Sequence, residues 1–246
     1  MSSIAGPIAE ESPDQTTGAK RSMAGSSVLV AGATGGLGSA IARDLSERGA
    51  TLTLVSRNSD RLNELDVPGH RVGLDLRDQD ACQAAVRAAV EHAGRLDVVV
   101  NAVGVVAFGP VDNLSLDAME ELFVTNTFIP IFLAQAALQT LGPEGVIVNI
   151  SGIIAEQNVP GMAAYGASKA AVRSFDESLS REARRRRVRV IDARPPHTET
   201  GLVERAIEGT APRMPPGLNP TVVAATICDA IAGDASELPS SAFGTA

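Results

Sequence analysis

The chain has 246 residues, of which 44% are hydrophobic, and a formal net charge of -8 at pH 7. This size and hydrophobic content allow one α/β domain with a sizeable core. The negative charge opposes general affinity for nucleic acid or anionic lipid, and no apolar run reaches the length of about eighteen residues that a membrane span requires. We therefore expect a soluble, cytoplasmic protein with neither nucleic acid nor a membrane as its partner.

The cysteines and histidines give no sign of a metal centre. Cys82 and Cys228 lie far apart in helix-like patterns, and His70, His92 and His197 are scattered along the chain. None of them has the spacing that metal ligands adopt. We expect reduced thiols and no metal site.

The chain begins with residues 1 to about 24, which are rich in Ser, Gly, Pro, Glu and Thr and lack the apolar core of a secretory signal. This composition predicts a disordered tail. From residue 25 to 246, β-branched runs alternate with helical patterns, which predicts a single α/β domain with a doubly wound, mostly parallel sheet and helices on both faces. The predicted strands are Val28–Ala31, Thr51–Ser56, Arg71–Asp75, Leu96–Asn101, Gly145–Ser151 and Val188–Arg194. The predicted helices are Leu37–Arg48, Asp78–Ala93, Ser115–Thr140, Ala163–Arg187 and Pro220–Ala232. Ser240–Phe243 is a candidate edge strand, and the Pro/Gly-rich stretch Gly209–Pro220 predicts a loop.

The first strand runs directly into a glycine-rich turn that opens the first helix. Residues 31–38 read Ala-Gly-Ala-Thr-Gly-Gly-Leu-Gly. Glycines let the backbone turn sharply and approach a pyrophosphate, while the N–H groups at the helix start attract its charge. This context favours dinucleotide binding over a merely flexible turn. The candidate cofactor-binding residues here are Gly32, Thr34, Gly35, Gly36, Leu37 and Gly38.

The end of the second strand indicates which dinucleotide is bound. An acidic residue there would accept hydrogen bonds from a ribose 2′-hydroxyl, but the chain has Ser56 and Arg57 instead. A guanidinium can hold a phosphate through two parallel hydrogen bonds. We therefore predict a preference for NADP(H) over NAD(H), with a solvated arginine at the strand end as the alternative.

The long helix Ser115–Thr140 contains an interruption and an apolar surface. Pro130 has no N–H to bond the carbonyl of Asn126, so we expect a kink there that frees this carbonyl, although packing alone could also explain the proline. Around Leu122–Leu141 the helix is apolar on nearly every side. Such a helix is buried all round. One side is expected to face the sheet and the other a second subunit, which predicts a homo-dimer or homo-tetramer.

Tyr165 is the single tyrosine of the chain and precedes Lys169 by four residues on a predicted helix. Side chains four apart share a helix face, and an ammonium beside a phenol favours the phenolate. The pair could therefore act as an acid or base, with a structural tyrosine and a solvated lysine as the alternative. The basic run Arg184–Arg187 follows on the same helix and indicates a solvated helix end rather than a nucleic-acid site.

Together these motifs resemble the short-chain dehydrogenase/reductase family, from about Ser26 onward. The resemblance implies a Rossmann fold, a nicotinamide cofactor, and hydride transfer between that cofactor and a carbonyl or secondary alcohol. It implies that Tyr165 is the proton donor or acceptor, that Lys169 lowers its pKa and holds the nicotinamide ribose, and that Asn126 supports a proton relay. The further cofactor contacts that it implies are Asp75, Leu76, Asn101, Ala102, Gly104, Tyr165, Lys169, Pro195, Thr198 and Thr200. A substrate loop is expected at about residues 196–219.

The sequence departs from the family pattern at three positions. Gly152 stands where the family carries its catalytic serine, so either the neighbouring Ser151 serves as the catalytic serine or one donor to the substrate oxygen is lost. Ser151 could equally cap local backbone at the end of its strand. Ala102 replaces an asparagine, and Pro196 replaces a glycine and cannot donate an N–H.

The loops at the site are rich in apolar residues and predict an apolar small-molecule substrate. These residues are Val105, Val106, Phe108, Ile153, Ile154, Met162, Met214 and Leu218. We therefore predict an oxidoreductase that acts with NADP(H) on a carbonyl/alcohol pair. The alternative is a catalytically weakened module on the same fold that senses a dinucleotide or serves assembly.

Overall fold

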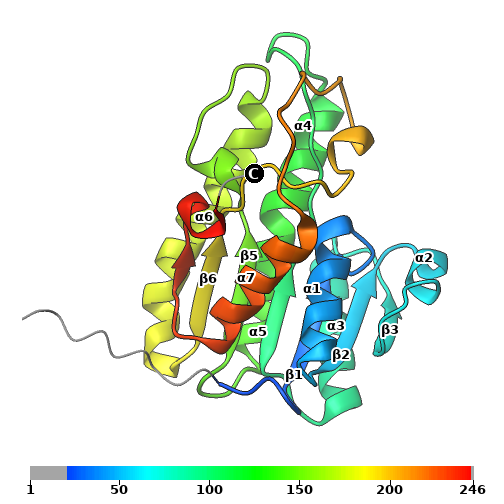
Figure 1. Cartoon of the computed structure of the whole chain (residues 1–246), viewed down its shortest axis with the longest axis vertical. Helices are drawn as coiled ribbons and strands as arrows, with labels where there is room; N and C mark the ends of the chain where they lie inside the picture. The colour runs from blue at the N-terminus through cyan, green and yellow to red at the C-terminus, as the bar shows by residue number, and fades with distance from the viewer. Residues whose placement is uncertain (1–20, 245–246) are drawn as a thin grey trace, which may run out of the picture.

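The computed structural model describes residues 21–244, which form a parallel sheet with helices on both faces (Figure 1). The strands are β1 (Ser27–Ala31), β2 (Thr51–Ser56), β3 (His70–Gly73), β4 (Val98–Asn101), β5 (Val146–Ile150), β6 (Arg189–Ala193) and β7 (Glu237–Leu238). The α-helices are α1 (Gly36–Glu47), α2 (Ser59–Asn63), α3 (Gln79–Ala93), α4 (Leu116–Phe123), α5 (Ile129–Leu138), α6 (Ala163–Ala183) and α7 (Pro220–Ala232). The strand order is β3-β2-β1-β4-β5-β6-β7, and every neighbouring pair is parallel.

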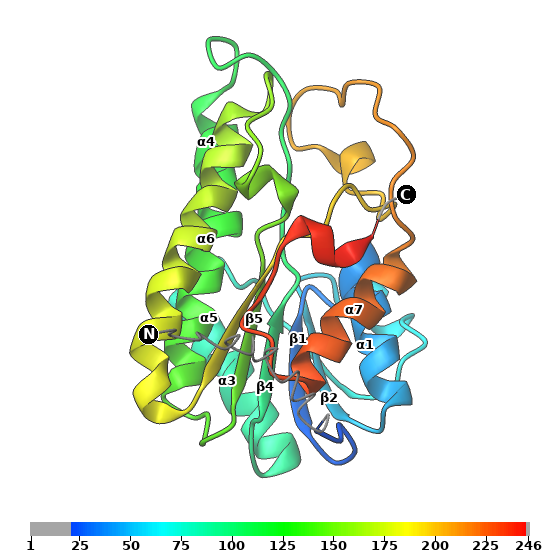
Figure 2. The same ribbon diagram turned by 60° about the vertical axis from the view of Figure 1, so that its left-hand side comes forward.

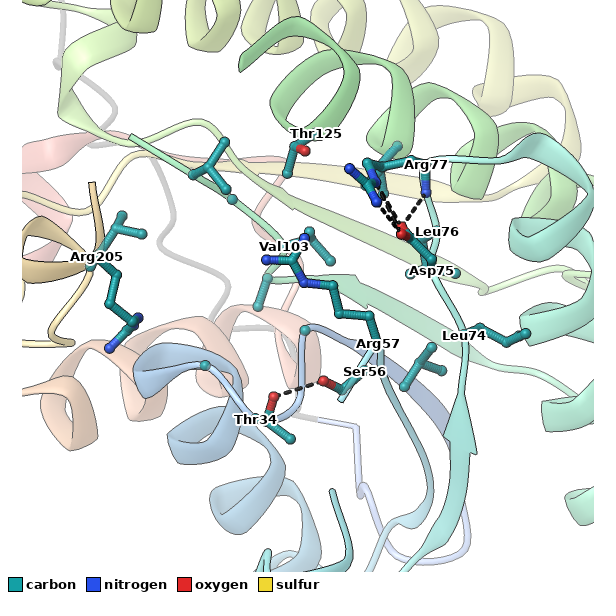
Figure 3. Close-up of a pocket in the computed structure, with 18 of the residues that line it drawn as sticks. Thr34, Ser56, Arg57, Leu74, Asp75, Leu76, Arg77, Val103, Thr125 and Arg205 are labelled. Carbon is teal, nitrogen blue, oxygen red and sulfur yellow. Dashed lines mark hydrogen bonds and ion pairs between the residues drawn. The ribbon is translucent and has the colours of Figure 1, made fainter. Parts of the chain in front are cut away.

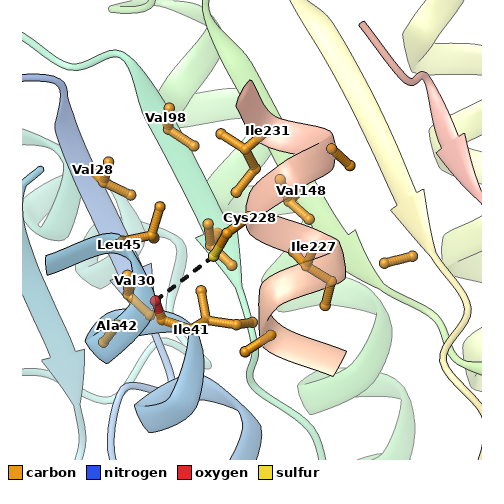
Figure 4. Packing of buried hydrophobic residues seen from close by; sticks show 14 of the residues in the cluster. Val28, Val30, Ile41, Ala42, Leu45, Val98, Val148, Ile227, Cys228 and Ile231 are labelled. Atoms are coloured by element: carbon orange, nitrogen blue, oxygen red, sulfur yellow. Dashed lines mark hydrogen bonds between the residues drawn. The ribbon is translucent and has the colours of Figure 1, made fainter. Parts of the chain in front are cut away.

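The two faces of the sheet are covered by different helices (Figure 2). Helices α1 and α7 pack on one face, where Val28 and Val30 of β1 meet Ile41 of α1 and Ile227 of α7 (Figure 4). Helices α3, α5 and α6 cover the other face, where Leu29 belongs to a second buried cluster. Because successive side chains of a strand point to opposite faces, β1 supplies both clusters and is apolar throughout its interior. The predicted doubly wound α/β fold is confirmed.

Two predictions near the chain ends are wrong. Ser240–Phe243 is a short 3-10 helix, and the edge strand is the preceding Glu237–Leu238, which pairs with β6. Residues 21–24, expected in the tail, pack on the domain: Met23 is buried in the core, and the Arg21 N–H donates to the Ala232 carbonyl. The rest of the predicted tail, residues 1–20, lies outside the described residues.

The helix predicted over Ser115–Thr140 is interrupted by a π-helical turn. This turn spans Val124–Phe128 between α4 and α5, and the Ile129 N–H bonds the carbonyl of Val124. Pro130 follows at the start of α5, as the predicted interruption requires. By length and composition Leu116–Leu138 could cross a membrane, but 56% of its most apolar window is buried inside the protein. It is a core helix.

The parallel arrangement assembles loops that lie far apart in the sequence. Parallel strands end at the same edge of a sheet, so the turn after β1 and the loops after β4, β5 and β6 meet there. The strand order reverses between β1 and β4, which is where ligands bind in open sheets of this kind.

Candidate active site

A groove runs across the carboxyl edge of the sheet, over the ends of β1, β2 and β4. Its walls come from the glycine turn, from the loops after β2, β3 and β4, and from residues 202–207 after β6. The lining residues are Gly32, Thr34, Gly35, Val55, Ser56, Arg57, Arg61, Leu74, Asp75, Leu76, Arg77, Ala102, Val103, Gly104, Val105, Thr125, Ile129, Leu202, Arg205 and Ile207. It brings together many of the predicted cofactor contacts from separate parts of the chain.

The glycines of the turn leave no space for side chains. Gly32 has φ +78°, and a Cβ on it would lie 2.8 Å from the Ala102 carbonyl oxygen. A Cβ on Gly38 would lie 2.2 Å from the carbonyl oxygen of Gly32. Within residues 21–244 no side chain caps the first N–H groups of α1, which begins at Gly36. This open backbone cradle fits the pyrophosphate of a dinucleotide.

Arginines concentrate at the end of the groove near β2 and β3 (Figure 3). Arg57 is exposed and forms no ion pair or hydrogen bond with the described part of the chain. The Arg61 Nη2 donates to the Thr34 carbonyl at 2.7 Å, and the hydroxyls of Thr34 and Ser56 lie 2.8 Å apart. Ser56 and Arg57 therefore lie where a group on the adenosine ribose is expected.

Asp75 is already engaged by a neighbouring cation. Arg77 Nη2 lies 2.5 Å from its carboxylate, and the hydrogen bond from Arg77 lowers the pKa of Asp75. Arg77 also pairs with Glu121 at 3.2 Å. Asp75 and Leu76, which the resemblance implies as cofactor contacts, both line the groove, but the carboxylate of Asp75 is tied to Arg77.

Asn126 and Lys169 do not line the groove themselves but lie beside Gly104, which does. Asn126 is fully buried on the π-helical turn, where its amide accepts from the Val105 N–H at 2.9 Å and donates to the Ser168 hydroxyl at 3.0 Å. A Cβ on Gly104 would lie 3.4 Å from Asn126 Oδ1 and 3.5 Å from Lys169 Nζ. The sequence-predicted asparagine and lysine thus both lie next to the same glycine.

Lys169 is 6% exposed, and its ammonium donates to the Ile150 carbonyl at 2.8 Å. Burial lowers the pKa of Lys169 to about 8, although the Asp192 carboxylate acts in the opposite direction. Tyr165 lies one turn earlier on α6, and burial raises the pKa of its phenol to about 12. The expected lowering of this pKa by Lys169 is therefore not found, because desolvation of the phenolate dominates.

Ser151 faces the protein interior. It is completely buried, and its hydroxyl donates to Asp192, which is also paired with Arg194. Arg194 further pairs with Glu156 and Glu237. This arrangement matches the structural alternative for Ser151, because the hydroxyl is committed to a buried ionic cluster.

Gly152, in the position of the family serine, has φ +79° and ψ 164°. Only glycine readily adopts this combination. The backbone at this position therefore differs from one that a serine could occupy without strain, so the departure in sequence is also a departure in conformation.

The segment after β6 folds back over the glycine turn. The Pro195 carbonyl accepts from the Ile153 N–H at 3.0 Å, and the Thr198 hydroxyl donates to the Pro196 carbonyl at 2.8 Å. Thr200 lies directly on the start of α1, since a Cβ on Gly36 would be 2.5 Å from the Thr200 carbonyl oxygen. Pro195 uses its carbonyl to hold the loop after β5, and Thr198 uses its hydroxyl within the segment itself.

Sequence reasoning missed some residues that line the groove. These are Val55, Arg61, Leu74, Arg77, Val103, Thr125, Ile129, Leu202, Arg205 and Ile207. Arg61 follows Arg57 at helical spacing, which could have signalled a second cation. For Arg205 no local signal exists, because its place depends on how the segment after β6 folds back.

Comparison with known proteins agrees with this geometry. A family model described as "short chain dehydrogenase" matches residues 26–210. An uncharacterized oxidoreductase of Staphylococcus epidermidis is 31% identical over 72% of this chain and 79% of its own length. A gluconate 5-dehydrogenase of Gluconobacter oxydans is 29% identical over 76% of each chain.

Solved structures share the fold. A dehydrogenase/reductase from Sinorhizobium meliloti has 25% sequence identity and a TM-score of 0.77, covering 90% of this chain and 97% of its own. A short chain dehydrogenase from Burkholderia cenocepacia, solved in complex with NADP, has 24% identity and a TM-score of 0.78, covering 90% and 99%.

Proposed function

We propose, since this chain belongs to the short-chain dehydrogenase family and is an NAD(P)-dependent oxidoreductase, that it uses NADP(H) and acts on an apolar ketone or secondary alcohol. The observation that carries the cofactor preference is the charge at the end of β2. Arg57 forms no ion pair or hydrogen bond with the described residues, although its charge helps to lower the pKa of Asp75, and Arg61 is held beside the glycine turn. Two guanidiniums there favour a 2′-phosphate over a 2′-hydroxyl.

In this proposal Tyr165 and Lys169 move the proton. The bound nicotinamide supplies or accepts the hydride. During reduction the Tyr165 phenol gives its proton to the substrate oxygen, and during oxidation the phenolate takes it back. Lys169 holds the nicotinamide ribose and, as an ammonium, stabilises the phenolate. Asn126 fixes the Val105 backbone beside them.

The glycine at position 152, in place of the family serine, lowers the turnover rate that we expect. Ser151 donates its hydroxyl to Asp192, so neither residue supplies the substrate oxygen with a second hydroxyl donor. In other enzymes, loss of one such donor lowers the rate on the order of a hundredfold or more. We expect slow turnover on generic ketones.

An apolar residue of the groove, Val105, and partly exposed apolar residues of the loops predicted to form the substrate site support an apolar substrate. Val105, Ile153, Met162 and Met214 are half-buried and retain exposed surface. Glu156, in contrast, is engaged by Arg194 and by the Ser240 hydroxyl at 2.7 Å, so its carboxylate is not free to recognise a charged substrate.

The test is a panel of apolar and carboxylate-bearing ketones with NADPH and NADH, using wild type and Tyr165→Phe. We expect wild type to reduce apolar ketones with NADPH. Tyr165→Phe should lose roughly 10²-fold to 10⁴-fold in turnover. Reduction of charged ketones alone would contradict the substrate class, and full activity of Tyr165→Phe would contradict the mechanism.

We also propose a soluble homo-oligomer that pairs through α4 and α5. Phe128 is 46% exposed and stacks on Phe132 at a centroid distance of 6.0 Å, and Phe123 and Leu116 are exposed on the same helical stretch. Exposed apolar side chains gathered in this way indicate an interaction surface. Sedimentation should give a dimer or tetramer that Phe128→Glu weakens; a monomeric wild type would contradict this assembly.

A further inference from the structure

The wall of the groove opposite β2 is formed by residues 198–209, which we name the strap. It contains a short 3-10 helix, Val203–Arg205. Thr200 contacts the first residue of α1, Gly36, and the Arg205 Nη2 donates to the Thr200 carbonyl at 3.3 Å. The guanidinium of Arg205 is thereby held next to the helix start that the glycine turn presents.

The strap is anchored on both sides of Arg205. Before it, Thr198 forms a parallel bridge with Leu218. After it, the Ile207 N–H donates to the Val106 carbonyl at 2.9 Å, and the Glu208 carboxylate accepts from the Ser115 N–H at 2.9 Å. Arg205 is therefore carried by a fixed segment, and a pre-positioned cation loses little entropy when it binds an anion.

Arg205 places an unneutralised charge at the groove, as far as the described residues show. Its side chain lines the groove and is exposed, and within residues 21–244 it forms no ion pair. Arg77 differs, because Asp75 and Glu121 neutralise it. Figure 3 shows Arg205 on a separate element from Arg57 and Arg77.

We infer that Arg205 binds the pyrophosphate of the cofactor from the strap, opposite the N–H groups of the glycine turn. This inference rests on the proposed function. The turn and the start of α1 mark the pyrophosphate position, whereas Arg57 at the end of β2 marks the ribose position. Thr200 and Gly36 hold Arg205 at the pyrophosphate position. Arg205 therefore binds a group that NADPH and NADH share.

The experiment measures dissociation constants of NADPH and NADH by calorimetry for wild type, Arg205→Ala, Arg57→Ala and Arg213→Ala. Arg205→Ala should weaken both cofactors by the same factor, at least about tenfold, and leave their ratio unchanged. Arg57→Ala should weaken NADPH selectively. Arg213→Ala removes the same charge from the neighbouring exposed loop and should change neither constant. Circular dichroism checks that each variant is folded.

Two results would overturn the inference while leaving the proposed function intact. Unchanged binding by Arg205→Ala would show that the guanidinium does not contact the cofactor. Selective loss of NADPH affinity would place Arg205 at the 2′-phosphate instead. If wild type binds neither cofactor, the proposed function fails and the inference fails with it.

Discussion

At the residue scale, the conformation of Gly152 leads to a direct test of backbone strain. A Cβ there would meet only the Pro195 carbonyl oxygen, at 3.9 Å, so space is available and the φ of +79° alone opposes a side chain. Gly152→Ala should therefore lower the free energy of unfolding by on the order of 1–3 kcal/mol, measured by urea denaturation. Gly166→Ala in α6 is the matched control, because its Cβ would make ordinary contacts and should stabilise the helix by roughly 0.5–1 kcal/mol. Equal effects of the two substitutions would contradict the strain.

Asp176 predicts a pH dependence of stability. Burial raises the pKa of its carboxyl well above the ordinary 3.8, Asp192 adds to this effect, and the Asn149 amide partly offsets it from 2.7 Å. Its other oxygen has no hydrogen-bond partner in the described part of the chain. The folded protein therefore keeps a proton that the unfolded chain releases, so this group lowers stability as the pH rises above about 4.

Asp176→Asn removes that titration. The stability of Asp176→Asn relative to wild type should increase from pH 4 to pH 8, by up to about 1.4 kcal/mol per pH unit while the folded carboxyl stays protonated. Urea denaturation across this range measures it. Glu177→Gln, exposed on the same helix, should show no comparable trend. A pH-independent difference for Asp176→Asn would mean that the folded carboxyl ionises normally.

At the scale of elements, the strap and α4 stabilise each other. Ser115 caps α4 by accepting from the Ala118 N–H at 3.1 Å, and its own N–H and hydroxyl donate to Glu208. Ser115→Ala should cost about 1 kcal/mol. Because the two residues share hydrogen bonds, the effects of Ser115→Ala and Glu208→Ala on the free energy of unfolding should be non-additive.

This coupling should weaken as the pH falls, because hydrogen bonds from Ser115 lower the pKa of Glu208 and a protonated carboxyl is a weaker acceptor than the carboxylate. A double-mutant cycle at neutral and acidic pH measures both effects. Limited proteolysis of residues 198–209 gives a second measurement, since Glu208→Ala should expose the strap. Strict additivity at neutral pH would contradict the coupling between Ser115 and Glu208.

The elements themselves follow from sequence patterns to different degrees. α7 begins at Pro220 and ends at Ala232 as predicted, because proline favours the first turn of a helix and apolar residues recur along α7 at helical spacing. The π-helical turn around Asn126 was predicted only as a kink. Proline removes one hydrogen bond, but it does not determine which backbone hydrogen bonds form in its place. The strap has no periodic pattern, and its anchoring depends on contacts between Glu208 and Ser115, which are 93 residues apart.

At the scale of the whole molecule, the site depends on the order of the strands. Tyr165, Lys169 and Asn126 were identified from motifs, and the fold brings Lys169 and Asn126 to Gly104. The sequence did not reveal that Ser151 points into the ionic cluster of Arg194, because that depends on the register between β5 and β6. The pKa of Tyr165 was equally inaccessible, since it depends on how deeply α6 is packed.

The most direct measurement is a titration of the ultraviolet absorbance of Tyr165, which is the single tyrosine in a chain without tryptophan. In the free protein we predict a pKa of about 12, set by burial. With saturating NADP⁺ the pKa should fall by at least about one unit, because the nicotinamide cation and Lys169 then favour the phenolate. A pKa that stays near 12 with cofactor bound would contradict Tyr165 as the acid/base of this oxidoreductase.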